Sequence, residues 1–214
     1  MPRIIVLGAA GTAGRATVAA ALARGHQVTA FVRDAAKAPE ATAVVEGDIT
    51  DAAAVAEAVE GHDVAVDSIY SAEADPAVIY PAAAEALIAA APPRLIHVTL
   101  STLLELSPGT KLADAPDFPE AFRAFSLGHG AGLNRITEST LDWTAVSPTT
   151  DFDRESAPTG SARVASLAEL GVTDFASAYS GTGNITYADF ATGILDEIEN
   201  PRHRKVHIGL TTAN

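Results

Sequence analysis

Three glycines near the beginning of the chain have the spacing of a phosphate-binding loop. They recur at every third position of VLGAAGTAGRATV, after the apolar run 3–8 and before a segment, 13–25, that is typical of a helix. In such a loop the first glycine permits a tight turn, the second lets the backbone approach a pyrophosphate, and the third lets the helix pack close to the strand. The free N–H groups that begin the helix then face the phosphates. Small residues also occur in turns for packing alone, but this context favours nucleotide binding by Gly8, Gly11, Thr12, Ala13 and Gly14.

Two arginines bear on which dinucleotide would bind. An NAD site has a ribose-binding carboxylate at the end of its second strand, and this chain has Arg33 there instead. Arg15 directly follows the third glycine. Because guanidinium groups bind phosphate in a bidentate manner, the pair favours NADP(H), with its 2′-phosphate, over NAD(H). Two alternatives stay open: Asp34 could be the ribose-binding acid displaced by one residue, and Arg33 could be a solvated surface charge.

The elements that must position these residues alternate between strands and helices. Strands are expected at 3–8, 27–33, 43–48, 63–68, 94–101 and 142–148, with a last one at 205–210. Helices are expected at 13–25, 51–61, 80–92 and 186–200, and another ends before residue 142. Asp51 has the position of an N-cap, and Thr186 with Asp189 has the pattern of a capping box. Such alternation predicts an α/β fold, a parallel sheet with helices on both faces in a single domain, 1–214.

Composition excludes several classes of function. The formal net charge of −13 disfavours nucleic acid and anionic membrane as partners. The absence of cysteine excludes disulfides, thiolate zinc sites and cysteine nucleophiles, and no other cluster has metal-ligand spacing. Segment 77–93 is too short and too polar to span a bilayer, and the chain enters its first strand without a signal peptide. We therefore expect a cytoplasmic protein that acts on a small molecule, with its oligomeric state left open.

The motifs together resemble a known family. GAAGTAGR, FVRD, EGDITD, DWTAVSP, ITYADFA and ENPRHR occur in an order similar to that of the atypical short-chain dehydrogenase/reductases, above all the small NmrA-like, NAD(P)H-binding group that includes biliverdin and flavin reductases. This resemblance covers essentially the whole chain and implies a Rossmann-type, doubly wound sheet. It also implies that Asp48 and Ile49 lie near the adenine and that the fourth and fifth strands end at the cofactor. The strand-end residues implied to line the cofactor are Ser68 and Thr99, and Pro148 and Thr149 are implied to approach the nicotinamide.

Orthodox members of that family carry a catalytic Tyr-x-x-x-Lys, which this chain lacks. No tyrosine stands four residues before Lys37, Lys111 or Lys205. The segment SIYSAE also departs from the small residues that are usual after the fourth strand, so Tyr70 could intrude on the cofactor or substrate site. Ser101, at the end of the fifth strand, matches a serine that can hydrogen-bond a substrate carbonyl, although a structural hydroxyl is common at that place.

The stretch SLGHGAGLNR, 126–135, lies at the chain position where orthodox members carry the Tyr-x-x-x-Lys pair. Its three glycines disfavour a helix by about 3 kcal/mol relative to alanine, which predicts a loop or frayed helix start over 126–132 and regular helix from about Leu133. Asn134 falls where relatives often have lysine. His129 falls where the biliverdin/flavin reductase type has histidine, and we interpret it as a proton donor or substrate contact, or else as a surface histidine. His97, in mid-strand, is expected to be packed and hydrogen-bonded.

Three functions are compatible with these sequence features. The first is an NAD(P)H-dependent reductase that acts on a flavin, quinone or carbonyl compound without a Tyr/Lys pair. The second is a non-catalytic NADP-sensing regulatory protein. The third is an epimerase, which the missing acid/base pair disfavours. The polar, irregular segment 151–184 is expected to form a substrate lid and C-terminal cap in each case.

Overall fold

A parallel sheet forms the centre of the molecule, and the computed structural model describes it within residues 1–213. The eight strands lie in the order β10-β12-β8-β5-β4-β1-β2-β3, and all but β10 are mutually parallel. Their bounds are β1 Arg3–Leu7, β2 Gln27–Val32, β3 Ala43–Glu46, β4 Val64–Asp67, β5 Leu95–Val98, β8 Trp143–Pro148, β10 Ala162–Val164 and β12 His207–Thr212. This arrangement confirms the predicted α/β, doubly wound fold of Rossmann type.

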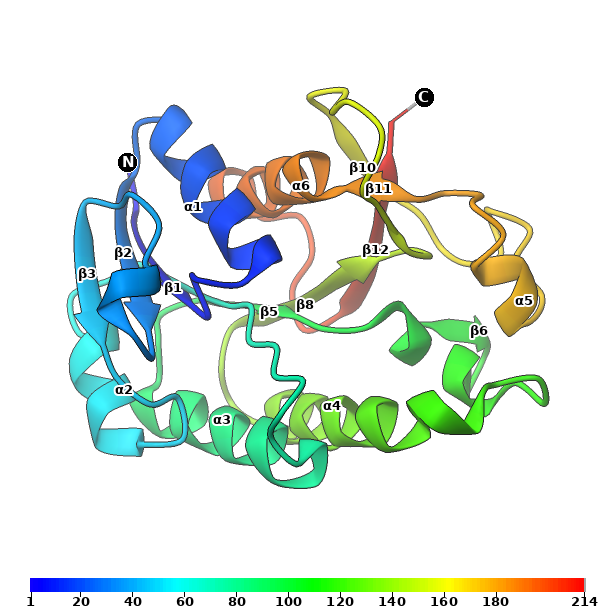
Figure 1. The fold of residues 1–214 in the computed structure, drawn as a ribbon, viewed down its shortest axis with the longest axis horizontal. Coiled ribbons are helices and arrows are strands. Elements are labelled where there is room, and N and C mark those ends of the chain that lie inside the picture. Colours follow the sequence, from blue (N-terminus) through cyan, green and yellow to red (C-terminus); the bar gives the residue numbers. More distant parts are fainter. Residues whose placement is uncertain (214) are drawn as a thin grey trace.

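Helices cover both faces of the sheet (Figure 1). One face carries α1 (Thr12–Ala23) and α6 (Tyr187–Glu199), and the other carries α2 (Ala52–Val59), α3 (Pro76–Ala90) and α4 (Glu120–Glu138). Each face has its own apolar core, because side chains alternate between the two sides of every strand. The chain therefore folds as one domain, and among the described residues no helix is long and apolar enough to cross a membrane.

Most helix ends lie where local signals predicted them. The Asp51 carboxylate accepts hydrogen bonds from the first amides of α2, and the Thr186 hydroxyl caps α6 through the Asp189 N–H. Phe190, Ile194 and Ile198 form the buried stripe of α6. Helix α3 begins four residues earlier than expected, because the Asp75 carboxylate caps it and a proline at its first position tolerates the missing N–H.

The prediction of a loop over 126–132 was wrong. Helix α4 runs through all three glycines without interruption. A Cβ atom added at Gly128 would lie 2.4 Å from the Pro76 carbonyl oxygen, and one at Gly132 would lie 2.9 Å from the Tyr80 carbonyl oxygen. The glycines therefore let α4 pack directly on the backbone of α3, and this packing offsets their low helix propensity.

Segment 151–184 is more ordered than its composition suggested, so the description of it as irregular needs correction. It contains β9 (Phe152–Asp153), which pairs with β11 (Ile185–Thr186), as well as the edge strand β10 and the short helix α5 (Phe175–Ala178). A hairpin of β6 (Glu105–Ser107) and β7 (Thr110–Lys111), also not predicted, lies nearby. These small elements build up the end of the molecule that carries the carboxyl ends of β5, β8 and β12.

Candidate functional site

The glycine loop is shaped by close contacts between backbone atoms. Gly8 has a φ of +78°, and a Cβ there would lie 2.7 Å from the Ser68 carbonyl oxygen. A Cβ on Gly14 would lie 2.3 Å from the Gly8 carbonyl oxygen, so α1 touches the end of β1 directly. Gly11 differs, because its Cβ would meet the protein only at 3.3 Å, from the Gly8 oxygen. Gly11 also lines the cavity described below, as a loop that admits a ligand requires.

The amino end of α1 adds a favourable electrostatic field to this loop. Gly11 is the N-cap, no side chain caps the helix, and the first turn carries no acidic residue. The amides of Thr12 and Ala13 consequently begin the helix without a side-chain acceptor. Free N–H groups and the positive end of the helix dipole together suit an anion such as a pyrophosphate.

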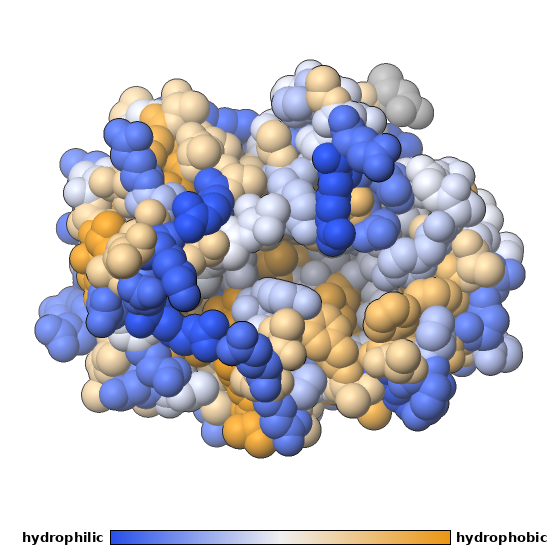
Figure 2. Space-filling view, viewed as in Figure 1, coloured by the Kyte–Doolittle hydropathy of each residue, from blue (hydrophilic) through white to orange (hydrophobic). Residues whose placement is uncertain are grey.

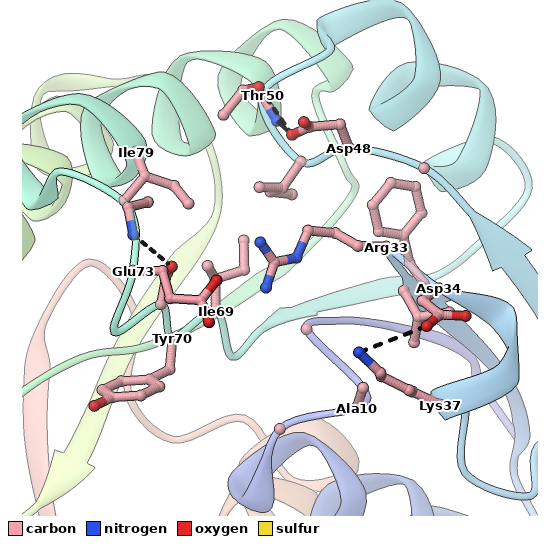
Figure 3. Close-up of a pocket in the computed structure, with 18 of the residues that line it drawn as sticks. Ala10, Arg33, Asp34, Lys37, Asp48, Thr50, Ile69, Tyr70, Glu73 and Ile79 are labelled. Carbon is pink, nitrogen blue, oxygen red and sulfur yellow. Dashed lines mark hydrogen bonds and ion pairs between the residues drawn. The ribbon is translucent and has the colours of Figure 1, made fainter.

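A cavity of about 710 Å³ adjoins the glycine loop on the side of β2 and β3. Its walls come from the glycine loop, the end of β2, the turn that follows β3, and the segment that leads from β4 into α3 (Figure 3). In the space-filling view the same face is hollowed between the half with α1 and the half with α3 and α4 (Figure 2). Tyr70, which is 66% exposed, lies at the rim of this cavity.

Arg33 extends into this cavity from the end of β2 (Figure 3). Its guanidinium group makes no ion pair within residues 1–213. The neighbouring Asp34 is engaged elsewhere, because its carboxylate accepts the Ala36 N–H at 3.0 Å and lies 3.6 Å from the Lys37 ammonium group. Arg15 also points to backbone, donating to the carbonyl oxygens of Ala10, at 2.9 Å, and Lys37. Within residues 1–213 the Arg33 guanidinium group therefore faces the cavity without an ion-pair partner, and the adjacent Asp34 carboxylate caps the short helix Ala35–Lys37.

Asp48 and Ile49 form the opposite wall. The Asp48 carboxylate accepts hydrogen bonds from the N–H and the hydroxyl of Thr50, both at 2.8 Å, and these bonds together with nearby Arg33 lower the pKa of Asp48. Asp48 is thus charged at neutral pH. Ile49, which is buried, supplies an apolar surface beside it.

The carboxyl ends of β4, β5 and β8 form the other half of the candidate site. The Ser68 hydroxyl donates to the Leu7 carbonyl at 3.2 Å, and the Thr149 hydroxyl donates to the Ala165 carbonyl at 3.4 Å. Pro148 is buried beside them. The Thr99 hydroxyl is also buried but has no partner among the described residues. Its hydrogen-bonding capacity is unfilled at the edge where α/β folds bind their ligands.

Ser101 lies at this edge and has a partner that the sequence did not reveal. Its hydroxyl oxygen is 3.1 Å from the hydroxyl oxygen of Tyr179, which follows α5. Burial raises the pKa of Tyr179, so the phenol is neutral near pH 7. No local signal could have found this contact, because 78 positions separate the two residues.

His129 is neither at the surface nor at a cavity. Its ring packs against Tyr80 and Phe125, at centroid distances of 3.6 and 4.7 Å, and both ring nitrogens lack a partner within residues 1–213. Burial, with a smaller contribution from His97, lowers the pKa of His129 to about 3. The interpretation as a surface histidine is wrong, and the structure does not bring this imidazole together with Ser101 or the glycine loop. His97 is buried and hydrogen-bonded as predicted, with its Nδ1 2.8 Å from the Asp67 carboxylate.

Acidification between pH 7 and pH 5 is expected to destabilise the protein through His129 and His207, whose pKa burial also lowers to about 3. Both are neutral in the folded state, whereas the unfolded chain takes up a proton near pH 6.5. Their contribution to stability is therefore complete above pH 6.5 and is lost as the pH falls towards 3. At pH 5 the free energy of unfolding is lower by up to about 2 kcal/mol for each of the two histidines.

Urea unfolding at pH 7 and pH 5 measures this effect. His129→Phe keeps an aromatic ring against Tyr80 but removes one titrating group, so it should lose less stability between the two pH values than the wild type. An identical loss in the two proteins would show that His129 does not titrate as its burial implies.

Known proteins are similar to this chain in sequence and in fold. A family model described as NAD(P)H-binding matches residues 8–201. The uncharacterized protein YwnB of Bacillus subtilis is 31% identical over 210 residues, which cover 94% of each chain. A 3-diazoavenalumate denitrifying reductase from Streptomyces is 53% identical over 57 residues, or 27% of this chain and 19% of that protein. The crystal structure of SP1627 from Streptococcus pneumoniae, named as a candidate NADH-flavin reductase, superposes with a TM-score of 0.85 at 27% identity over the whole of both chains.

Proposed function

Because the chain belongs to the NAD(P)H-binding family, we propose that it is an NADPH-dependent oxidoreductase that reduces a small flavin, quinone or carbonyl compound. The names of two relatives, a flavin reductase and a denitrifying reductase, support the reaction class. When bound, the dihydronicotinamide supplies a hydride. The protein contributes the binding surfaces and holds the two reactants together, which by itself can provide much of the rate for an easily reduced acceptor.

We propose that the pyrophosphate binds at the glycine loop and the adenosine half in the adjoining cavity. The fit to phosphates is supported by Gly11, which lines the cavity, and by the uncapped amides of α1, which supply donors. The cavity fits an adenine, since Ile49 offers an apolar face and Asp48 a charged acceptor for an exocyclic amine. The glycine loop thus suits the charged pyrophosphate, and the cavity suits the adenine.

Arg33 is the observation that carries the choice of NADPH. A guanidinium group that extends into the adenosine cavity without an ion-pair partner in the described chain suits the 2′-phosphate of the ribose. The carboxylate that could bind the 2′-hydroxyl of NADH, Asp34, also lines the cavity, but it already accepts the Ala36 N–H and lies 3.6 Å from the Lys37 ammonium group.

The nicotinamide half is proposed to lie over the ends of β4 and β5. The adenosine cavity occupies the β2 side of the glycine loop, so the rest of the cofactor must extend the other way. β5 lies two strands from β1, or roughly 10 Å at ordinary strand spacing. Ser68 and Thr99 come within this span. Pro148 and Thr149, one strand further, would border the ring.

Segment 151–184 is proposed to cover the acceptor. It joins the sheet through β10 and brings α5 close to the residues that follow β5. It therefore closes the end of the cleft opposite the adenosine cavity.

Oxidation of NADPH, followed at 340 nm against a panel of one flavin, one naphthoquinone and one aromatic aldehyde, tests this function. We expect at least one acceptor to be reduced at a rate well above the rate without protein, because the cleft orients both reactants. The matched control is Gly11→Val, which should remove the catalysed rate.

A regulatory protein that senses NADP is the second candidate, because the chain has no Tyr-x-x-x-Lys. It predicts tight NADPH binding with no oxidation by any acceptor. That outcome would contradict the reductase while leaving the cofactor site in place.

A further inference from the structure

We propose that Tyr179, held by Ser101, is the proton donor that completes the reduction of a carbonyl acceptor. This inference rests on the proposed NADPH-dependent reduction and adds to it a specific acid from an unexpected part of the chain. The two hydroxyl oxygens lie 3.1 Å apart, within hydrogen-bond distance. Ser101 is buried, whereas Tyr179 is 39% exposed, so the phenol is the member of the pair that a ligand can reach.

Tyr179 is held from three directions. The Asp117 carboxylate, which precedes α4, accepts the N–H groups of Phe175 and Ala176 at 3.1 and 2.9 Å and so fixes the beginning of α5. The Phe175 ring stacks on the Tyr179 ring at a centroid distance of 4.5 Å. Ala178, between them, is completely buried in a small apolar cluster that also contains Leu104. A phenol fixed in this way is preorganised, as a proton donor must be.

The place of the pair fits a proton transfer. Ser101 follows β5 at the carboxyl edge of the sheet, the edge at which the nicotinamide half is proposed to lie. Two residues before it stands Thr99, whose buried hydroxyl has no partner among the described residues. Burial disfavours the phenolate and the Asp151 carboxylate does the same, so the pKa of Tyr179 is raised and the phenol keeps its proton until the acceptor needs it.

The reduction transfers one hydride and one proton to the acceptor. The carbonyl carbon of the acceptor accepts a hydride, with its two electrons, from the reduced nicotinamide. The π pair of the carbonyl moves to its oxygen, which takes the proton of the Tyr179 hydroxyl. The acceptor becomes an alcohol, NADPH becomes NADP⁺, and Tyr179 becomes a phenolate to which the Ser101 hydroxyl donates a hydrogen bond. Water then returns a proton to the exposed phenolate.

Tyr179→Phe tests the donor role, since it removes only the hydroxyl. We expect turnover of an aromatic aldehyde to fall by about 10²–10⁴-fold, with the NADPH dissociation constant unchanged within twofold. Reduction of a quinone should fall far less, because its product can take protons from water. Tyr187→Phe is the control, because the Tyr187 ring only stacks on Phe152, at a centroid distance of 3.9 Å. Equal effects on aldehyde and quinone, or no effect on either, would overturn the proposal.

Spectroscopic titration of the protein without cofactor provides a second readout. The phenolate absorbs near 295 nm, and the chain has only four tyrosines. Tyr179→Phe should remove one ionisation with a pKa above 10, and Ser101→Ala should move that ionisation to still higher pH, because Ser101 stabilises the phenolate. An unchanged titration in Ser101→Ala would overturn the pair itself. If that shift is present but the wild type reduces no acceptor, the proposed function fails, and the donor role fails with it.

Discussion

Gly11→Val is expected to lower the affinity for NADPH by at least about 100-fold, or roughly 2.7 kcal/mol, while the fold is retained. Gly11 has a φ of −74° and a ψ of 166°, which any residue adopts, so the backbone does not require glycine. An added Cβ would lie 3.3 Å from the Gly8 carbonyl oxygen and 4.0 Å from the Ser68 carbonyl oxygen, so a shift of a few tenths of an ångström accommodates it. The two methyl groups of valine would then occupy the open space before the first amides of α1, where the phosphates are proposed to bind. Equilibrium titration with NADPH measures the loss, and far-UV circular dichroism checks the fold.

Gly14→Ala is the matched variant, and it is expected to change the stability of the fold, which Gly11→Val leaves nearly unchanged. Its Cβ would lie 2.3 Å from the Gly8 carbonyl oxygen, so α1 and β1 must move apart. We expect a lower melting temperature for Gly14→Ala and a nearly unchanged one for Gly11→Val. Undiminished NADPH affinity in Gly11→Val would refute the assignment of the phosphate loop.

The parts of the fold that depend on local signals could be predicted from the sequence. The strand–glycine–helix pattern placed β1, the loop and α1 correctly, and the cap at Thr186 with its apolar stripe placed α6. The resemblance to the NAD(P)H-binding, flavin-reductase-like group of atypical short-chain dehydrogenase/reductases is confirmed by the family model and by a solved structure. These features share a cause, because each is encoded within a few neighbouring residues.

Features that depend on contacts between distant segments could not be predicted. Gly128 and Gly132 disfavour a helix locally, and only the carbonyl groups of α3 at Pro76 and Tyr80 explain why α4 is helical there. The same packing buries His129, for which the sequence suggested a proton donor, a substrate contact or a surface histidine. Tyr179 stands in a segment without clear periodicity, and only the folded chain brings it to Ser101.

Arg33→Ala is expected to weaken NADPH binding by about 10–100-fold and NADH binding by less than about threefold. A hydrogen bond to a charged group contributes about 1.5–3 kcal/mol, and only NADPH would offer a 2′-phosphate to the Arg33 guanidinium group. Arg135→Ala is the control, because Arg135 is also exposed but pairs with Glu85 on α3, away from the cavity. Titration of both nucleotides against the three proteins gives the selectivity directly. Equal losses for NADPH and NADH in Arg33→Ala would mean that Arg33 does not bind the 2′-phosphate.

The central claim is that the adenosine half of NADPH binds in the cavity between the glycine loop and Arg33. Competition with adenosine 2′,5′-bisphosphate tests it most directly, because this fragment has the adenine and both ribose phosphates but no nicotinamide. We expect the wild type to bind NADPH at least about 10-fold more tightly than NADH, and the bisphosphate to displace NADPH far better than adenosine 5′-monophosphate does, since one guanidinium–phosphate contact contributes at least about 1.4 kcal/mol. Equal affinities for NADPH and NADH, together with no displacement by the bisphosphate, would contradict the account.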